Sequence, residues 1–144
     1  MKPLPHTYTV ELAGDAEEYA VVSSAGVPEL RTAAPEDFDG PGDAWSPEHL
    51  LMAAIETCFM FTFRAIASAS KVKFTSLRVC GQGVVDRKEG VTKFTEIILR
   101  PRLTIAAGTD RDRALRVIEK AEKACLVSAS LSTPIWLEPE ITAV

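Results

Sequence analysis

The first third of the chain alternates short apolar stretches with turn residues. Residues 7–12 and 19–24 are rich in β-forming side chains, and the first of these stretches alternates apolar with polar positions. Residues 27–32 form a third such stretch. Pro28 within it favours the edge of a sheet, because proline has no N–H to donate to a strand ladder. The pattern predicts three strands before residue 33.

A well-marked helix start follows a loop over residues 33–45 that is rich in proline, glycine and acids. Ser46 is a good N-cap, Pro47 suits the first helical turn, and Glu48 carries a negative charge to the positive end of the helix dipole. The sequence therefore predicts that a helix begins at Ser46-Pro47-Glu48.

The body of this helix is apolar around nearly its whole circumference, from residue 48 to residue 67. Such a helix is buried on most sides, which predicts packing against a sheet and against a second copy of the chain. Glu56 and Arg64 interrupt the segment. A charge near the middle of a membrane costs at least about 2.5–3.5 kcal/mol, so we predict a buried helix and no membrane partner.

The second half of the chain predicts a hairpin. Residues 72–85 and 91–103 have strand patterns, and the polar segment 86–90 joins them. A final strand is predicted over residues 134–137 and Ile141.

A second helix is predicted between the hairpin and the last strand, with Thr109-Asp110 as its cap. Its apolar stripe has helical spacing and places Cys125 inward with Ala114, Ile118 and Ala121. The order of strands, helix, hairpin, helix and strand predicts an α+β fold, not the strict alternation of a parallel doubly wound sheet.

Length, charge and cysteine content narrow the functional classes. The 144 residues fit a single domain, 1–144, with an ordinary hydrophobic core. A net charge of −4 with scattered lysines and arginines argues against a nucleic-acid partner. The N-terminal residues have no apolar signal-type region, and the three cysteines are an odd number. We therefore expect a cytoplasmic protein with reduced thiols.

Two of the three cysteines lie in distinctive sequence contexts. Cys58 follows Glu48 by ten residues on the apolar helix and is itself followed by Phe59, whereas Cys125 lies in Cys-Leu-Val-Ser near the end of the second helix. Cys80 occurs within a plain strand pattern and is interpreted as a small core residue. The two histidines lack the spacing of metal ligands, and no metal or cofactor is expected.

In this arrangement the sequence resembles the OsmC/Ohr family of thiol-dependent peroxidases (osmotically inducible protein C and organic hydroperoxide resistance types). The family pattern is Ser/Asn-Pro-Glu, then Cys-Phe ten residues after the glutamate, and later a Cys-Pro-x-Ser element on a second helix. The resemblance extends over almost the whole chain, from the N-terminal strands to the last strand. The order and separation of these features make it specific.

The resemblance implies an OsmC-like fold, an intertwined homodimer and two active sites at the subunit interface. Cys58 would attack an organic hydroperoxide, and its sulfenic acid would condense with the resolving thiol Cys125. A dithiol of the lipoyl type would reduce the resulting disulfide. The expected activity is that of an antioxidant oxidoreductase in the oxidative stress response.

Two departures from the family pattern concern the reactivity of Cys58. A mid-helix thiol in apolar surroundings needs a nearby cation to lower its pKa, and the family's early-strand arginine, which the glutamate matching Glu48 holds, is missing here. Arg31 is the candidate substitute, with Arg64 as a second one. The other departure is Leu126, which stands where the family usually has proline.

The position of Glu48 limits what it can do within its own chain. Ten helical residues span about 15 Å, so Glu48 cannot reach Cys58 directly. It would serve the partner subunit's site if two antiparallel helices cross near a two-fold axis, and a plain role as a helix N-terminal charge is the alternative. For the whole chain, the alternative function is a non-catalytic or redox-sensing protein that binds a small apolar ligand.

Overall fold

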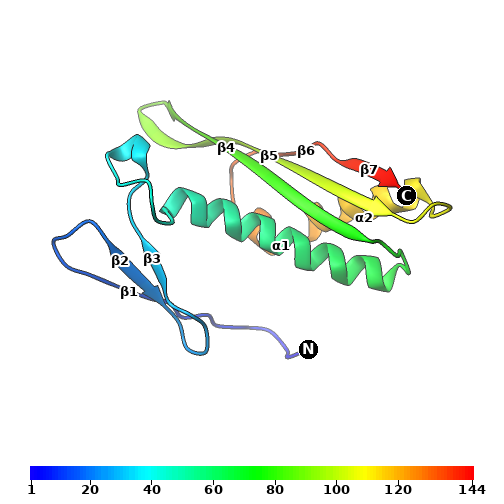
Figure 1. Cartoon of the computed structure of the whole chain (residues 1–144), viewed down its shortest axis with the longest axis horizontal. Coiled ribbons are helices and arrows are strands. Elements are labelled where there is room, and N and C mark those ends of the chain that lie inside the picture. The colour runs from blue at the N-terminus through cyan, green and yellow to red at the C-terminus, as the bar shows by residue number, and fades with distance from the viewer. The chain divides into compact units, whose positions relative to one another are not determined.

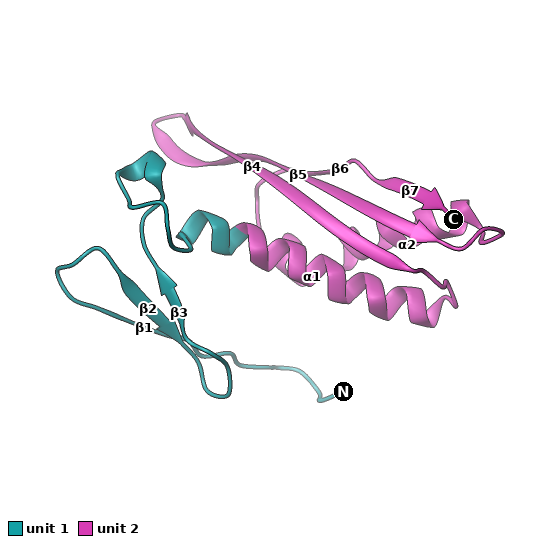
Figure 2. Cartoon of the chain, viewed as in Figure 1, with its two compact units in different colours: residues 1–51 teal, residues 52–144 magenta.

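A computed structural model describes all residues from 1 to 144, and the chain forms two compact units. The N-terminal unit holds residues 1–51 and the C-terminal unit holds residues 52–144 (Figure 2). Each unit is described by itself below. The long helix α1 contributes its first turn to the first unit and the rest of its length to the second.

The N-terminal unit contains a small antiparallel sheet in the order β1-β2-β3, as predicted. Its strands are β1 (Glu11–Gly14), β2 (Ala20–Ser23) and β3 (Leu30–Thr32). The first strand begins later than its alternating pattern predicted, because residues 7–10 make no ladder with β2. A short 3-10 helix, η1 (Glu36–Phe38), then interrupts the loop that leads to α1.

Helix α1 (Pro47–Ala69) begins where the sequence predicted. The Ser46 Oγ atom accepts a hydrogen bond from the backbone N–H of His49 at 3.1 Å, which satisfies one of the free donors of the first turn. The same oxygen lies 2.7 Å from His49 Nδ1. Ser46 is fully buried, and both of these contacts of its hydroxyl are with His49 in the first turn of α1.

One stripe of α1 is buried within the single chain, and the predicted burial of the other sides against a second copy stays a prediction. The buried residues recur every four positions, at Ile55, Phe59, Phe63 and Ala67. Phe61, on another face, is 61% exposed. By length and composition α1 is the one helix that could cross a membrane, a test that the core helix of a soluble protein also passes.

The main sheet of the C-terminal unit is built on a long antiparallel hairpin (Figure 1). Strand β4 (Ser76–Lys88) begins later than predicted and extends further toward the shared turn, whereas β5 (Val91–Ile105) begins where predicted and ends two residues later. The turn is only Glu89-Gly90, and both residues have positive φ, as a two-residue hairpin loop requires. The predicted final strand forms two pieces, β6 (Ile135–Leu137) and β7 (Glu140–Ala143), which pair parallel with β5.

The two main helices cover one face of this sheet, so the α+β fold is confirmed. Along β5, alternate residues are buried, from Ile97 to Ile105, as expected when one face is packed and the other open. Gly81 and Gly83 of β4 let α1 approach closely. A Cβ atom at Gly81 would collide with the Glu56 carboxylate, and one at Gly83 would lie 2.8 Å from Met52 Sδ.

Helix α2 (Arg111–Ala124) follows the hairpin, and a single turn, α3 (Leu126–Ala129), comes directly after it. The predicted cap of α2 is confirmed, because Asp110 accepts a hydrogen bond from the Arg113 backbone N–H at 3.0 Å. The turn α3 was not predicted. Cys125 separates the two helices with an extended backbone, φ −67° and ψ 112°.

Candidate active site

Cys58 from α1 and Cys125 from the junction of α2 and α3 lie close together, near enough for each thiol to shift the pKa of the other. Cys125 is completely buried, and Cys58 is partly exposed. Both are free thiols. The inward position predicted for Cys125 from the stripe of α2 is therefore confirmed, and the two cysteines singled out by their sequence contexts share one site.

The break between α2 and α3 explains how the backbone reaches Cys58. At Cys125 the chain leaves the helical conformation for one residue and then makes the turn α3. The first N–H groups of a helical turn have no acceptor within it. Those of Leu126 and Val127 are close enough to the Cys58 thiol to lower its pKa.

These donors give Cys58 an unusual acidity. Burial alone would raise its pKa. Hydrogen bonds from the Cys125 thiol, the Val127 backbone, the Thr62 hydroxyl and the Leu126 backbone outweigh that effect, so the pKa of Cys58 lies below its ordinary value. A thiol with a lowered pKa is ionised more often at neutral pH, and the thiolate is the nucleophile.

Hydrogen-bond donors, not a cation, lower the pKa of Cys58 within the C-terminal unit. This changes the sequence-based expectation that a mid-helix thiol needs a nearby positive charge. Two of the four donors are backbone groups after Cys125, which no side-chain motif reveals. The Thr62 Oγ1 atom lies 4.0 Å from Cys58 Sγ. The sequence could have predicted this contact, because residues four apart on a helix are neighbours.

The pKa of Cys125 is shifted in the opposite direction, above its ordinary value. Burial raises its pKa, and the hydrogen bond with Cys58 raises it further, while the hydroxyl and backbone of Ser128 oppose both effects in part. The pair therefore consists of one thiol biased toward the thiolate and one biased toward the protonated form. Of the two thiols, Cys58 is therefore the one that ionises more readily.

Ser128 acts on Cys125 and is itself linked to Glu122. The Ser128 hydroxyl donates to Glu122 Oε2 at 3.3 Å, and Ser128 is buried. Burial raises the pKa of Glu122, and the Ser128 hydrogen bond lowers it in part. Ser128 belongs to the Cys-Leu-Val-Ser motif, but sequence reasoning gave no role to Glu122, whose only signal is an acid one turn before a buried cysteine.

The departure at Leu126 has a structural consequence. Proline at this position would have no N–H, whereas the backbone of Leu126 donates to Cys58. Its side chain is 72% exposed and contributes little to the core. The substitution therefore adds one donor to the thiolate site.

The structure places Glu48 in the first turn of α1. Its Oε2 atom is buried without a hydrogen-bond partner. Buried carboxylate oxygens in proteins are nearly always hydrogen-bonded, because the desolvation cost is otherwise uncompensated. Glu48 therefore has an unused acceptor, and its place ten residues before Cys58 on one helix keeps the two side chains apart within the chain.

Arg31 makes its contacts within the N-terminal unit. Its guanidinium donates to the Asp43 backbone oxygen at 3.0 Å, lies 3.7 Å from the Asp43 carboxylate and stacks 4.5 Å from the Tyr19 ring centroid. The Tyr19 hydroxyl also donates to Asp43, and this bond is the main reason why the pKa of Tyr19 is raised. Arg64 lies over the Phe61 ring at 5.4 Å from its centroid.

Cys80 lies on the open face of the main sheet and is exposed. The interpretation of Cys80 as a small core residue is therefore wrong. The alternation of strand β4 explains the error, since Val79 and Gly81 face the helices and every second residue faces out. Cys80 is separate from the thiol pair.

The fold and this site define a class of small α+β proteins. Its members have one cysteine on a long central helix and a second cysteine after a later helix. Within that class, the family model for OsmC-like proteins matches residues 40–140. The chain belongs to the OsmC-like protein family. The matched segment includes Glu48, Cys58 and Cys125.

Individual relatives agree with this assignment. The chain is 28% identical over 109 residues to the uncharacterised protein YmaD of Bacillus subtilis, covering 74% of this chain and 73% of that protein. An OsmC-like protein of unknown function from Vibrio cholerae has the same fold, with a TM-score of 0.84 at 17% identity over 94% of this chain and 99% of its own. An organic hydroperoxide resistance protein from Elizabethkingia anophelis matches over the full length of both chains, at 23% identity and a TM-score of 0.77.

Proposed function

We propose that this protein is a cytoplasmic thiol peroxidase that reduces organic hydroperoxides through Cys58 and Cys125. The observation that carries the proposal is the contact between the two thiols, with the pKa of one lowered and that of the other raised. Two structural relatives, from Elizabethkingia anophelis and Legionella pneumophila, are described as organic hydroperoxide resistance proteins, which supports the substrate class.

The first step would be attack of the Cys58 thiolate on the outer oxygen of the hydroperoxide. The O–O bond breaks, an S–O bond forms, and the alkoxide leaves as an alcohol after taking up a proton. Cys58 becomes a sulfenic acid, oxidised by two electrons. Backbone N–H groups of Leu126 and Val127 stabilise the thiolate before attack and remain in place for the sulfenic acid.

The second step would be attack of Cys125 on the sulfenic sulfur. An S–S bond forms, hydroxide leaves and takes up the Cys125 proton as water, and the pair is oxidised to a disulfide. Contact between the two thiols means that little movement is needed. An external dithiol of the lipoyl type would then reduce the disulfide and be oxidised itself, returning both cysteines to thiols.

The proposed assembly is an intertwined homodimer in which α1 packs against its partner. Phe61 and other apolar residues of α1 are exposed in one chain, and a long apolar helix with a single buried stripe has surface left to cover. Phe61→Asp should convert the dimer to monomer in sedimentation velocity. If the variant sediments like the unmodified protein, α1 does not form the interface.

Glu48 and Arg31 are proposed to complete the site. The unpartnered Glu48 Oε2 atom needs a donor, and a cation brought close by dimer formation would supply one. Arg31 is the candidate, although Asp43 already pairs with it. Glu48→Gln and Arg31→Gln should each slow sulfenic acid formation by about tenfold or more, the size expected for losing a charge-assisted hydrogen bond. Arg64→Gln is the matched control with a similar change in charge.

The decisive experiment treats the reduced protein with one equivalent of cumene hydroperoxide and maps the products by mass spectrometry. A rapid disulfide between Cys58 and Cys125, absent in Cys58→Ser, is expected. Turnover is then measured with dihydrolipoamide and with glutathione. Unchanged thiols after exposure to peroxide would contradict the proposal and favour the alternative, an OsmC-like protein that binds a small apolar ligand without thiol chemistry.

A further inference from the structure

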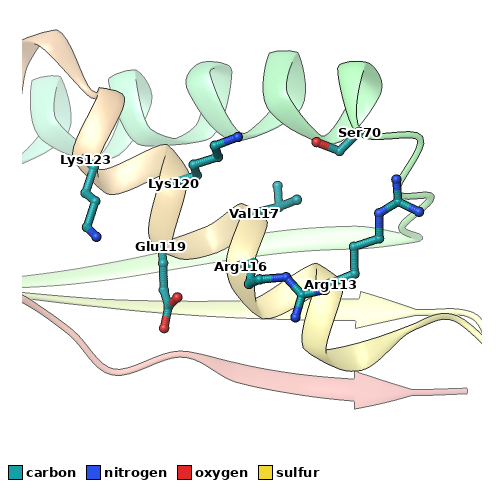
Figure 3. A pocket seen from close by; sticks show the side chains of 7 residues that line it. All are labelled: Ser70, Arg113, Arg116, Val117, Glu119, Lys120 and Lys123. Carbon is teal, nitrogen blue, oxygen red and sulfur yellow. The ribbon is translucent and has the colours of Figure 1, made fainter.

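A groove along α2 is lined by residues other than the thiol pair. The groove has a volume of about 420 Å³ and is open between this helix and the turn just after α1 (Figure 3). Six of its lining residues carry the argument: Ser70, Arg113, Arg116, Val117, Lys120 and Lys123. The groove lies within the C-terminal unit, so its walls belong to one compact body.

The groove concentrates positive charge in a chain whose net charge is −4. Its four basic residues recur on α2 at positions 113, 116, 120 and 123, which is the spacing of one helix face. Glu119 is the single acid in the lining, so three net positive charges remain. Figure 3 shows Arg113 and Lys120 directed toward the side of Ser70, and Glu119 directed away from it.

None of these four cations makes an ion pair within the chain. The ion pairs of the protein involve Arg31, Arg100 and Arg102. Asp112 lies four residues before Arg116 and Glu119 lies three residues after it, so both could reach it on the helix surface. Neither acid forms an ion pair with Arg116. Like charges held together in a concave surface repel one another, and a bound anion would relieve that repulsion.

The lining also indicates the chemistry of the anion. Val117 is its one apolar residue, and Val117 itself is nearly buried, so an apolar ligand would gain little. The volume falls within the range of small-molecule pockets, about 300–1,000 Å³, and exceeds the needs of a single phosphate. Guanidinium groups bind phosphate through two parallel hydrogen bonds, and ammonium groups bind it as point charges.

We propose that this groove binds a small molecule with two or more phosphate charges, such as a pyrophosphate or a nucleoside diphosphate. Arg113 and Lys120 would hold the phosphates on the side of Ser70, whose hydroxyl would donate a further hydrogen bond. Arg116 and Lys123 would extend the positive field along the helix. This site is independent of the proposed peroxidase reaction.

The test is isothermal titration of the full-length reduced protein with inorganic pyrophosphate at physiological ionic strength. We expect saturable binding at one site per chain. The variant R113Q/K120Q should bind at least about tenfold more weakly, because two charge-assisted hydrogen bonds are lost. The control variant K88Q/K93Q removes the same charge from the exposed β4–β5 hairpin and should bind like the unmodified protein.

Three outcomes would overturn the proposal. One is the absence of binding heat with pyrophosphate and with adenosine diphosphate. Another is equal weakening in R113Q/K120Q and K88Q/K93Q, which would mean that only net charge matters. The third is binding to vesicles of anionic phospholipid without binding to either soluble ligand, which would assign the groove to a lipid surface. Circular dichroism of both variants checks that the fold is retained.

Discussion

The two faces of the main sheet offer the same residue types in opposite settings. On the face covered by helices, Ile97, Leu99 and Leu103 are 0 to 1% exposed, and the covering helices carry the neighbouring thiols Cys58 and Cys125. On the open face, Cys80 stands alone and exposed. On the covered side, Cys58 therefore has hydrogen-bond donors and a second thiol nearby, whereas Cys80 on the open face is exposed to solvent.

Charged residues differ between the faces in the same way. On the open face, Arg100 donates to Glu138 at 2.9 Å and to Gln82 at 2.9 Å, in pairs that water screens. On the covered face, the carboxylate of Glu56 lies against the backbone of Gly81, and burial raises its pKa while that backbone hydrogen bond lowers it in part. The same residue types therefore occur on both faces, and on the covered face burial and hydrogen-bond donors shift their pKa values.

The largest difference is expected in the response to peroxide. Cys58→Ser should abolish the peroxide-induced disulfide completely, whereas Cys80→Ser should leave its rate and yield unchanged. The measurement is quantitative mass spectrometry after one equivalent of cumene hydroperoxide. Loss of the disulfide in Cys80→Ser would show that the open face takes part, and the contrast between the faces would fail.

Substitutions on the two faces should also differ in how much they lower the free energy of unfolding. Phe63 is fully buried and contacts Phe74 with ring centroids 5.1 Å apart. Phe63→Ala should cost about 3–5 kcal/mol of unfolding free energy. Trp136, on the open face, is 59% exposed, and Trp136→Ala should cost less than about 1 kcal/mol. Urea unfolding followed by circular dichroism measures both, and equal costs would contradict the comparison.

A smaller effect is expected where helix and sheet approach most closely. Gly81→Ala places a methyl group against the Glu56 carboxylate and should destabilise the protein by about 1–3 kcal/mol, as overpacking does. The neighbouring change Cys80→Ala, on the open face, should stay within about 0.5 kcal/mol. A neutral Gly81→Ala would mean that α1 is free to move away from β4.

The finest test concerns the backbone donor at Leu126. Cys125 before it is already extended, and position 126 begins a helical turn, so proline fits sterically. Leu126→Pro should remove one hydrogen bond to Cys58 and raise its pKa, whereas Leu126→Ala should not.

The pH dependence of alkylation measures that change. The rate at Cys58 rises with pH as the thiolate forms, and a lowered pKa places that rise at lower pH than for an ordinary cysteine thiol. Leu126→Pro should move the rise of Cys58 upward in pH, toward that of an ordinary thiol. Identical profiles for Leu126→Pro and Leu126→Ala would rule out the backbone donor.

Much of the fold followed from local patterns. The caps at Ser46 and Asp110 and the apolar stripe of α2 are local properties, and each was confirmed in place. The strand ends were less accurate, because a ladder forms only where a neighbouring strand is present. Residues 7–10 have the composition of a strand and no ladder partner in β2.

The sequence by itself determined the family, the α+β order and the two cysteines of interest, since these depend on residue types and their spacing. Tertiary structure alone decided that Cys80 faces outward, that only one stripe of α1 is buried, and that backbone N–H groups after Cys125 act on Cys58. The reason is physical. Backbone donors exist at every residue, and only the packing of α1 against the junction of α2 and α3 directs two of them to one sulfur.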